Sequence, residues 1–340
     1  MSTQEISDKK LTKKDFTSDQ EVRWCPGCGD YAILAGVQRT LPELGLTPER
    51  TVFISGIGCA ARFPYYMKTY GFHTIHGRAP ALATGLKLSN PDLSVWVVTG
   101  DGDGLSIGGN HLLHVLRRNV DLQILLFNNR VYGLTKGQYS PTSSTGQVTP
   151  STPYGSIDDP VSPIPYALGA NARFVARCYD TAQKQFGGIL QRAHDYQGAA
   201  FVEILQNCPV FNDGEFDAVT DRKTAAEHQL WAEHGKPLVF GSKDAPKGLV
   251  LSKGGLGLDV VELGGDYSEE DVLVHDERNV TLAFLLAQLV SPTVMGVLYC
   301  EPTPASYDRA VRAQTEQQRE KHGEGDLNAL LRSGHTWTVG

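Results

Sequence analysis

Apolar and polar residues alternate along the middle of the chain in two distinct periods. Short, largely apolar segments rich in Val, Ile, Leu and Phe are typical of buried strands. They lie at residues 51–55, 93–99, 121–127, 173–177 and 200–205. The segments between them have the pattern of helices, at residues 78–88, 107–118 and 181–196. Strands that alternate with helices predict an α/β fold, with a mostly parallel sheet and helices on both faces.

Two regions depart from this alternation. Residues 130–165 are rich in Ser, Thr, Pro and Gly, which predicts a long loop that is functional or mobile. Beyond residue 212 only a helix at 282–290 and a strand at 293–299 are expected before a polar tail. We therefore expect three parts along the chain. They are a flexible N-terminal arm (1–20), a main domain (21–212) and a C-terminal extension (213–340) that packs on the core or on a partner subunit.

Composition and charge narrow the class of protein. The 340 residues include 31 Lys and Arg and 38 Asp and Glu, and the net charge of −7 disfavours a nucleic-acid or membrane-surface binder. The longest apolar runs are far shorter than the roughly 20 residues of a membrane span. The polar N-terminus has no signal-peptide pattern, so we expect a cytoplasmic protein whose six cysteines are reduced.

The sharpest local motif is Gly100-Asp101-Gly102-Asp103-Gly104, which directly follows an expected strand and precedes a helix. Glycines at the carboxyl end of a strand let backbone N–H groups approach a phosphate. Asp101 adds an oxygen ligand of the kind that Mg²⁺ prefers. The pair Asn128-Asn129 ends the next strand, and parallel strands end at one edge of a sheet. The Asn129 side chain and the Val131 carbonyl can therefore bind the same ion.

Two other interpretations of these loops carry less weight. A plain Asp-Gly turn would explain the first motif but not its pairing with Asn128-Asn129. Residues 56–61 (GIGCAA) fit a dinucleotide-binding pattern, which requires an acidic residue about 20 positions further on. Residues 59–91 contain neither Asp nor Glu, so dinucleotide binding is disfavoured. The paired loops instead resemble the motif that binds thiamine diphosphate.

Four cysteines stand where they can share a ligand. Cys25 and Cys28 form a C-x-x-C motif, Cys59 follows the strand at 51–55, and Cys208 follows the strand at 200–205. Four such thiolates suit a [4Fe–4S] cluster. Structural zinc and a catalytic dithiol are the alternatives. Zinc sites usually use two short cysteine pairs, whereas 148 residues separate the last two cysteines here.

With these motifs in one order, the chain resembles the beta subunit of a 2-oxoacid:ferredoxin oxidoreductase, most closely the 2-oxoglutarate type. The segments that carry the resemblance are residues 25–29, 55–59, 76–79, 100–104 and 128–138. The match is specific over about residues 21–212 and weaker beyond. It implies that this part is the diphosphate-type domain of a thiamine diphosphate enzyme.

With the resemblance, four groups of site residues are expected. The ligands of one [4Fe–4S] cluster would be Cys25, Cys28, Cys59 and Cys208. The Mg²⁺ ligands would be Asp101, Asn129 and the Val131 carbonyl. The residues expected to bind the cofactor are Gly100, Asp101, Gly102, Asp103, Asn129, Val131, Gly133, Leu134, Thr135, Cys59, His76 and Gly77. The residues expected to act on the substrate are Lys136, Leu134 and Arg62.

Some of these residues have plainer alternatives. Lys136 would pair with a substrate carboxylate, but it is otherwise a solvated loop charge. Leu134 would contact the bound adduct. Arg62 and His76 would otherwise be surface or capping residues, because exposed Arg and His side chains are common.

The implied reaction is the coenzyme A-dependent oxidative decarboxylation of a 2-oxoacid, with 2-oxoglutarate to succinyl-CoA as the best match. Electrons from the thiamine diphosphate adduct pass through the cluster to ferredoxin, and a low-potential donor allows the reverse, reductive carboxylation. Only one cofactor domain is visible. The pyrimidine-side domain and its activating glutamate are therefore expected from an alpha subunit, in an αβ or (αβ)₂ complex.

Two other functions fit part of the pattern. A thiamine diphosphate subunit of a non-oxidative 2-oxoacid decarboxylase would keep the paired loops but would not need four converging cysteines. A non-catalytic zinc-binding interaction subunit would need no thiamine site, so Asp101→Ala would leave its cofactor content and activity unchanged. Iron content separates the oxidoreductase from the decarboxylase.

Overall fold

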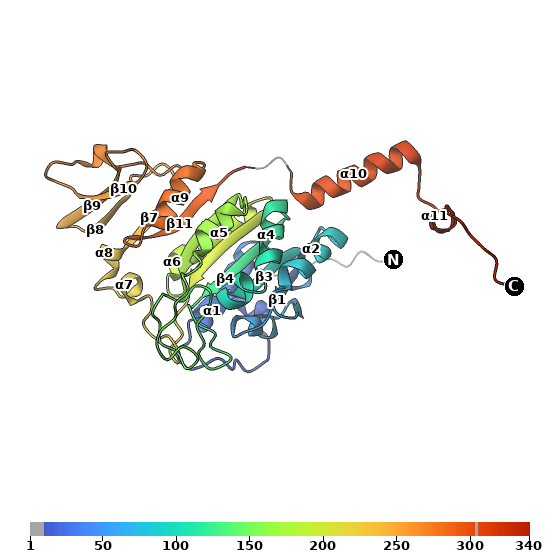
Figure 1. Cartoon of the computed structure of the whole chain (residues 1–340), viewed down its shortest axis with the longest axis horizontal. Helices are drawn as coiled ribbons and strands as arrows, with labels where there is room; N and C mark the ends of the chain where they lie inside the picture. The colour runs from blue at the N-terminus through green and yellow to red at the C-terminus, as the bar shows by residue number, and fades with distance from the viewer. Residues whose placement is uncertain (1–9, 303–304) are drawn as a thin grey trace.

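An eight-stranded sheet forms the centre of the computed structural model, which describes residues 10–302 and 305–340 (Figure 1). In spatial order its strands are β2 (Tyr70–His73), β1 (Thr51–Ser55), β3 (Ser94–Gly100), β4 (Leu122–Asn128), β6 (Ala199–Leu205), β5 (Phe174–Tyr179), β11 (Thr293–Cys300) and β7 (Gln229–Ala232). The first six run parallel to one another. Only β11 pairs with its neighbour β5 in the antiparallel sense, and β7 follows β11 in parallel. The predicted α/β fold with a mostly parallel sheet is confirmed.

Helices cover both faces of this sheet because alternate strand residues point to opposite sides. One face carries α2 (Ala79–Ser89), α4 (Gly109–Arg118), α5 (Pro163–Gly169) and α9 (Val280–Gln288). The other carries α1 (Asp30–Glu43), α6 (Gln183–Asp195) and the 3₁₀ helix η3 (Ala60–Tyr66). Val52 and Ile54 belong to the first core, and Phe53 between them belongs to the second. Each central strand is therefore buried on both sides.

The boundary expected at residue 212 cuts through this sheet, because β11 and β7 join it from the C-terminal third. The other short elements of that third are α7 (Asp217–Thr220), α8 (Ala225–His228) and the 3₁₀ helix η4 (Glu269–Asp271). A second, antiparallel sheet of β8 (Val239–Ser242), β9 (Ala245–Leu251) and β10 (Leu258–Glu262) packs beside them. Periodicity missed these strands because they are short and half exposed.

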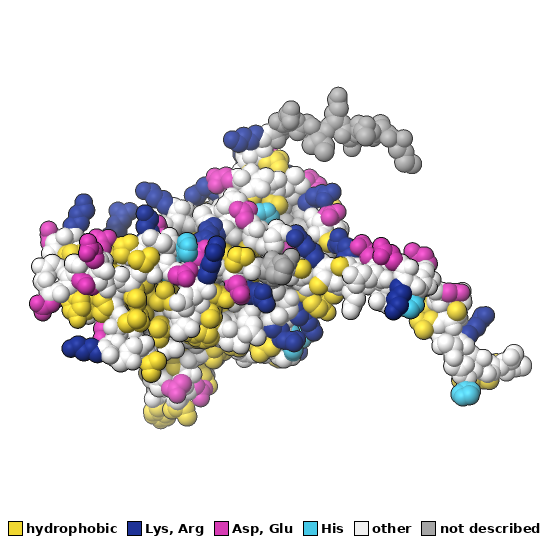
Figure 2. Space-filling view, turned by 90° about the horizontal axis from the view of Figure 1, so that it is seen from above, with side chains coloured by type: hydrophobic (Ala, Val, Ile, Leu, Met, Phe, Trp, Pro, Cys, Tyr) yellow, Lys and Arg dark blue, Asp and Glu magenta, His cyan; other side chains and the backbone are white. Residues whose placement is uncertain are grey.

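The chain ends in an arm that leaves the body of the molecule (Figure 1). It comprises α10 (Tyr307–His322), α11 (Leu327–Leu331) and the residues after them. Lys, Arg, Asp and Glu side chains are intermixed along it (Figure 2). The expected polar tail is thus partly helical.

The N-terminal segment is packed where the structure describes it. Residues 1–9 of the expected arm lie outside the described residues. The 3₁₀ helix η1 (Lys13–Phe16) buries Phe16 completely, and Thr17 pairs with Met67 beside it. The expectation of a flexible arm is therefore wrong for residues 12–18. Across the described ranges, no helix combines the length and the apolar character needed to cross a bilayer.

Candidate active site

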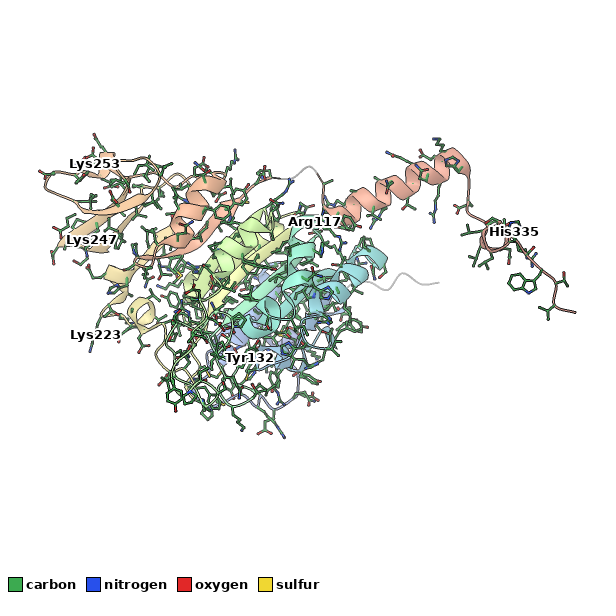
Figure 3. The ribbon with its side chains drawn as sticks, viewed as in Figure 1. Arg117, Tyr132, Lys223, Lys247, Lys253 and His335 are labelled. Carbon is green, nitrogen blue, oxygen red and sulfur yellow. The ribbon has the colours of Figure 1, made fainter. Side chains whose placement is uncertain are left out.

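A cavity lies at the carboxyl edge of the sheet, beside the ends of β1, β3 and β4. Eleven of the twelve residues expected to bind the cofactor line it, and Gly77 alone does not. The residues of its lining that sequence reasoning missed are Asp30, Ile57, Gly58, Ala60, Phe127 and Tyr132. The parallel strand order brings these loops together, as the motif spacing predicts. Tyr132, labelled in Figure 3, marks the position of the cavity in the lower part of the molecule.

Asp101 begins α3 (Asp101–Leu105) and is almost completely buried in the cavity wall. Its Oδ2 accepts hydrogen bonds from Ser140 Oγ at 2.5 Å and from Thr142 Oγ1 at 2.6 Å. Burial raises the pKa of this carboxyl, although the hydroxyl donors favour its ionised form. A buried carboxylate held by two donors suits a divalent cation, whose charge would offset the cost of burial.

Asp103 has a different role, because its oxygens face protein groups. Oδ1 accepts hydrogen bonds from the backbone N–H groups of Ile57 at 3.0 Å and Gly77 at 2.8 Å. His76 Nδ1 lies 2.8 Å from the same oxygen, and Thr99 Oγ1 donates to Oδ2 at 2.7 Å. Asp103 therefore fastens the loops after β1 and β2 to the end of β3. It thereby shapes the cavity, which His76 also lines.

The two asparagines after β4 point in different directions. Asn129 lines the cavity, and Gln206 Oε1 accepts a hydrogen bond from its Nδ2 at 2.8 Å. The Oδ1 of Asn129 accepts a hydrogen bond from the Val131 N–H at 3.2 Å. This contact folds the chain so that Val131 also lines the cavity. Asn128 points into the sheet and donates to Glu203 Oε1 at 2.8 Å. The oxygen donors expected for Mg²⁺ thus share one cavity with Asp101.

Two glycines of the cavity wall lie close to other side chains, and close packing requires a glycine at the first of them, Gly102. A Cβ at Gly102 would lie 2.2 Å from the ring of Tyr132, whose hydroxyl donates to the Gly102 carbonyl at 3.0 Å. A Cβ at Gly133 would lie 3.6 Å from Cys208 Sγ and 3.8 Å from Cys59 Sγ. These are ordinary contact distances, so the cavity wall at Gly133 lies next to two of the predicted cluster ligands.

The four predicted ligand cysteines come together at the same edge. Gln206 Nε2 lies 3.2 Å from Cys28 Sγ, and the Gly29 N–H donates to the Asn207 carbonyl at 3.1 Å, so the C-x-x-C loop lies beside the end of β6. Burial, together with the nearby Asp30, Cys208 and Cys25, raises the pKa of Cys59 to about 12. Burial, Asp30 and the neighbouring cysteines also raise the pKa of Cys28.

Within the described ranges, no set of three or more His, Cys, Asp or Glu side chains is arranged to hold a single metal ion. A [4Fe–4S] cluster is larger than one ion and needs thiolates spaced around it. Its positive irons would also stabilise thiolates that this environment otherwise keeps protonated. Cys25, Cys28, Cys59 and Cys208 lie near enough to influence one another electrostatically, and their role as ligands of such a cluster stays a prediction.

Asp30 is the most unusual residue that sequence reasoning missed. It is 1% exposed, its Oδ1 has no hydrogen-bond partner, and burial raises its pKa to about 7. It stands two positions after Cys28 and lines the cavity together with Cys59. A signal for it was present, since an acidic residue stood two positions after a predicted ligand at the start of a helix.

The long loop at residues 130–165 is ordered around the cavity. Ser140 and Thr142 hold Asp101 from this loop, while Leu134 and Thr135 line the cavity. Leu134 is half exposed. Lys136 adopts a left-handed conformation (φ 80°) at the next turn and is exposed outside the lining, a strained position for a residue with a side chain.

Arg62 also lies outside the cavity lining. It is exposed, and its Nε donates to the Tyr66 hydroxyl at 3.1 Å. The contacts that Arg62 and Lys136 would make with a substrate stay predictions.

Comparison with known proteins identifies the family. Residues 56–204 match the family model of the thiamine pyrophosphate enzyme, C-terminal TPP binding domain. The chain is 53% identical to the 2-oxoglutarate oxidoreductase subunit KorB of Mycobacterium tuberculosis, over 98% of this chain and 90% of that one. It is 47% identical to the beta subunit of 2-oxoacid:ferredoxin oxidoreductase 1 of Aeropyrum pernix, over 56% of this chain and 60% of that one.

A solved structure agrees with these relatives. It is the 2-oxoglutarate:ferredoxin oxidoreductase of Magnetococcus marinus with 2-oxoglutarate, coenzyme A and succinyl-CoA bound. The chain is 32% identical to it with a TM-score of 0.76, over 96% of this chain and 97% of that one. The chain belongs to the beta subunits of the 2-oxoacid:ferredoxin oxidoreductases. The predicted family and the thiamine diphosphate domain are confirmed, and the chain is one subunit of an oxidoreductase.

Proposed function

We propose that this chain is the beta subunit of a coenzyme A-acylating 2-oxoglutarate:ferredoxin oxidoreductase. The single observation that carries the proposal is the meeting of two predicted sites at one sheet edge: Cys59 lines the cavity that contains Asp101 and Asn129. A thiamine site next to a four-cysteine site suits electron transfer from a decarboxylated 2-oxoacid. The non-oxidative decarboxylase gives no reason for this juxtaposition.

The chain's own residues would hold two cofactors. Asp101, Asn129 and the Val131 carbonyl would bind Mg²⁺ and, through it, the diphosphate of thiamine diphosphate. The four cysteines would hold one [4Fe–4S] cluster. When bound, thiamine diphosphate supplies an electron sink for the carbanion left by decarboxylation. The apolar part of the cavity wall, including Phe127, limits access of water to the reacting atoms.

The substrate end of the cavity opens at residues 134–136. Leu134 would contact the reacting carbon chain, and Lys136 would pair with the second carboxylate of 2-oxoglutarate across the open mouth. Arg62 would act as a further cation near Cys59, to which it is electrostatically coupled. The same geometry allows reductive carboxylation when a low-potential donor reverses the electron flow.

An alpha subunit would complete this site. Leu134 in the cavity lining is 50% exposed, and Ile75, next to the cavity residue His76 in the chain, is 68% exposed. Apolar groups that remain exposed around a binding site favour a protein partner. The alpha subunit would supply the pyrimidine-side domain and the activating glutamate, in an αβ or (αβ)₂ enzyme. The reduced cysteines expected in this chain suit the cytoplasm.

The first experiment measures iron, acid-labile sulfide and zinc in the complex purified without oxygen. We expect about four irons and four sulfides per beta chain, as a four-cysteine cubane requires. Replacement of Cys25, Cys28, Cys59 or Cys208 by Ser should abolish them, while Cys300→Ser, a control on the far strand β11, should retain them. Zinc or no iron in a folded preparation would contradict the oxidoreductase.

The second experiment tests the substrate with Lys136→Gln in the reconstituted enzyme. We expect the KM for 2-oxoglutarate to rise at least about tenfold, because a cation paired with a carboxylate is lost. The KM for pyruvate, which has no second carboxylate, should change little. An equal change for both 2-oxoacids would remove the argument for a dicarboxylic substrate.

A further inference from the structure

The four cysteines lie between the cavity and the protein surface. Cys59 lines the cavity, whereas Cys25 is exposed together with Pro26 and Gly27. On the proposed function, an electron that leaves the cavity through the cluster reaches the surface at the loop of residues 25–28. The surface around this loop is therefore where an electron acceptor must approach.

Two segments from different parts of the chain are joined beside this loop. Thr17 and Met67 form an antiparallel bridge, and the Lys68 N–H donates to the Phe16 carbonyl at 2.9 Å. Ser18 Oγ donates to the Tyr65 carbonyl at 2.9 Å. The complete burial of Phe16 anchors the N-terminal segment on the body. Residues 12–24 and 59–68 thus present one continuous surface.

Tyr66 and Trp24 connect this surface to the cysteines. The Tyr66 hydroxyl accepts from the Arg23 N–H at 3.0 Å and from Arg62 Nε at 3.1 Å. The rings of Trp24 and Tyr66 lie edge to face with centroids 4.8 Å apart. Trp24 Nε1 donates to the Cys59 carbonyl at 2.8 Å. These contacts hold the surface in a fixed position relative to the predicted cluster.

This surface is basic although the whole chain carries a net charge of −7. We call it the basic face and define it by its exposed cations, Lys13, Lys14, Arg23, Arg62 and Lys68. Residues 59–68 contain no carboxylate, and residues 12–24 contain three, one of which pairs with Arg23 at 3.2 Å. The exposed ring of Tyr65 adds an aromatic group of the kind enriched at protein interfaces.

We propose that the basic face docks an acidic iron–sulfur electron carrier, so that the carrier's cluster lies against the loop of residues 25–28. Opposite charges would raise the association rate and orient the carrier before electron transfer. The exposed Cys25 loop then forms the shortest contact between the two clusters. This proposal rests on the proposed function and names the surface that the electron acceptor uses.

The test reverses three charges of the basic face in the complete αβ enzyme, as K13E/K14E/K68E. Within the described residues, no hydrogen bond or ion pair joins these lysines to the cavity lining or to the four cysteines. The control is K236E/K243E/K253E, which makes the same change of charge around the distant three-stranded sheet, where Figure 3 labels Lys253. Both variants are assayed with a small acidic ferredoxin and, separately, with methyl viologen.

We expect kcat/KM for ferredoxin to fall at least about tenfold at low ionic strength in K13E/K14E/K68E only, because steering is lost. The difference should shrink as salt screens the charges. Methyl viologen reduction should stay unchanged in both variants, which shows that the variants fold and that the chemistry is intact.

Two results would contradict the proposal that the basic face docks the carrier. Unchanged ferredoxin kinetics with intact viologen reduction would mean that the carrier binds elsewhere. A selective rise in the KM for coenzyme A would mean that these cations bind coenzyme A instead. An unmodified complex that reduces neither acceptor with any 2-oxoacid would contradict the proposed function itself, so the two failures are distinguishable.

Discussion

Asp101 and Asp103 stand two positions apart in one motif but have different roles because their neighbours differ. Asp101 meets two hydroxyl groups and the cavity, whereas Asp103 meets two backbone N–H groups, Thr99 and His76. The motif alone could not separate them, since both were acidic residues between glycines. The separation depends on donors that come from distant loops.

Thr142→Val should weaken Mg²⁺-dependent thiamine diphosphate binding by about 10–100-fold, because the hydroxyl that orients the Asp101 carboxylate is lost. Calorimetric titration of the complex measures the affinity. Thr145→Val in the same loop is the control, since Thr145 Oγ1 donates only to the Asp158 carbonyl at 3.0 Å. An unchanged affinity in Thr142→Val would show that Asp101 needs no such support.

His275 gives a prediction about pH. It is 1% exposed, its Nε2 bonds to the Val297 carbonyl at 2.8 Å, and burial lowers its pKa below 6.5. Between the lowered pKa and 6.5 the unfolded chain binds a proton that the folded His275 does not bind, so folding stability is lost as the pH falls. His275→Gln removes this dependence.

The free energy of unfolding of the unmodified protein should therefore fall toward that of His275→Gln between pH 7.5 and 5.5. Urea unfolding at several pH values measures the difference, and subtraction removes what the carboxylates contribute to both proteins. His335→Gln in the exposed C-terminal arm is the control for the same substitution away from the core (Figure 3). A constant difference for His275→Gln would contradict the lowered pKa.

At the scale of elements, a polar chain crosses four neighbouring strands behind the cavity. Asn128 of β4 donates to Glu203 of β6, whose Oε2 lies 2.7 Å from Nε of Arg177 on β5. Arg177 also donates to the Val294 carbonyl of β11 at 3.4 Å. Glu203 and Arg177 are both buried. The chain links the parallel strands to the antiparallel strand that sequence analysis placed in another domain.

Glu203→Gln should destabilise the protein by about 3–5 kcal/mol, because it leaves the buried Arg177 without its counter-ion. The double variant R177M/E203L should be less destabilised than the single one, since it removes both buried charges. Urea unfolding of the three proteins measures this. A double variant that is no more stable than Glu203→Gln would show that the pair contributes more than its own burial costs.

At the scale of the whole molecule, the active site and the C-terminal arm belong to opposite ends of the sheet. The loops of the cavity follow the carboxyl ends of the strands. The base of α10 meets the other end, where Asp308 Oδ1 accepts from the Asp121 N–H at 3.1 Å and the Tyr307 ring lies 5.7 Å from the Arg118 guanidinium. Beyond this base every residue of α11 is exposed.

Removal of residues 324–340 should change the free energy of unfolding by less than about 0.5 kcal/mol, since exposed residues bury no apolar surface on this chain. Thiamine diphosphate binding should stay unchanged, because the cavity lies at the other end of the sheet. Thermal unfolding and cofactor titration of the truncated protein measure the two quantities. A marked loss of either would show that the arm folds back on the body.

The sequence by itself determined the central strands, the mostly parallel character of their sheet, and the loops that carry the site. Thr51–Ser55 and Leu122–Asn128 are largely apolar and buried at every position, which is typical of strands covered on both faces. The motifs at Gly100 and Asn128 come directly at the ends of β3 and β4. The local pattern was sufficient to find these motifs, because their candidate ligand residues lie within a few positions of each strand end.

Only the tertiary structure decided the rest. It joined β7 and β11 to the main sheet, buried Phe16 in a segment that composition marked as free, and placed Asp30 in the cavity wall. It also divided the roles of Asp101 and Asp103. Each outcome depends on contacts between residues far apart in the chain. A local sequence pattern predicts that a side chain is buried, but it does not predict which distant residue packs against that side chain.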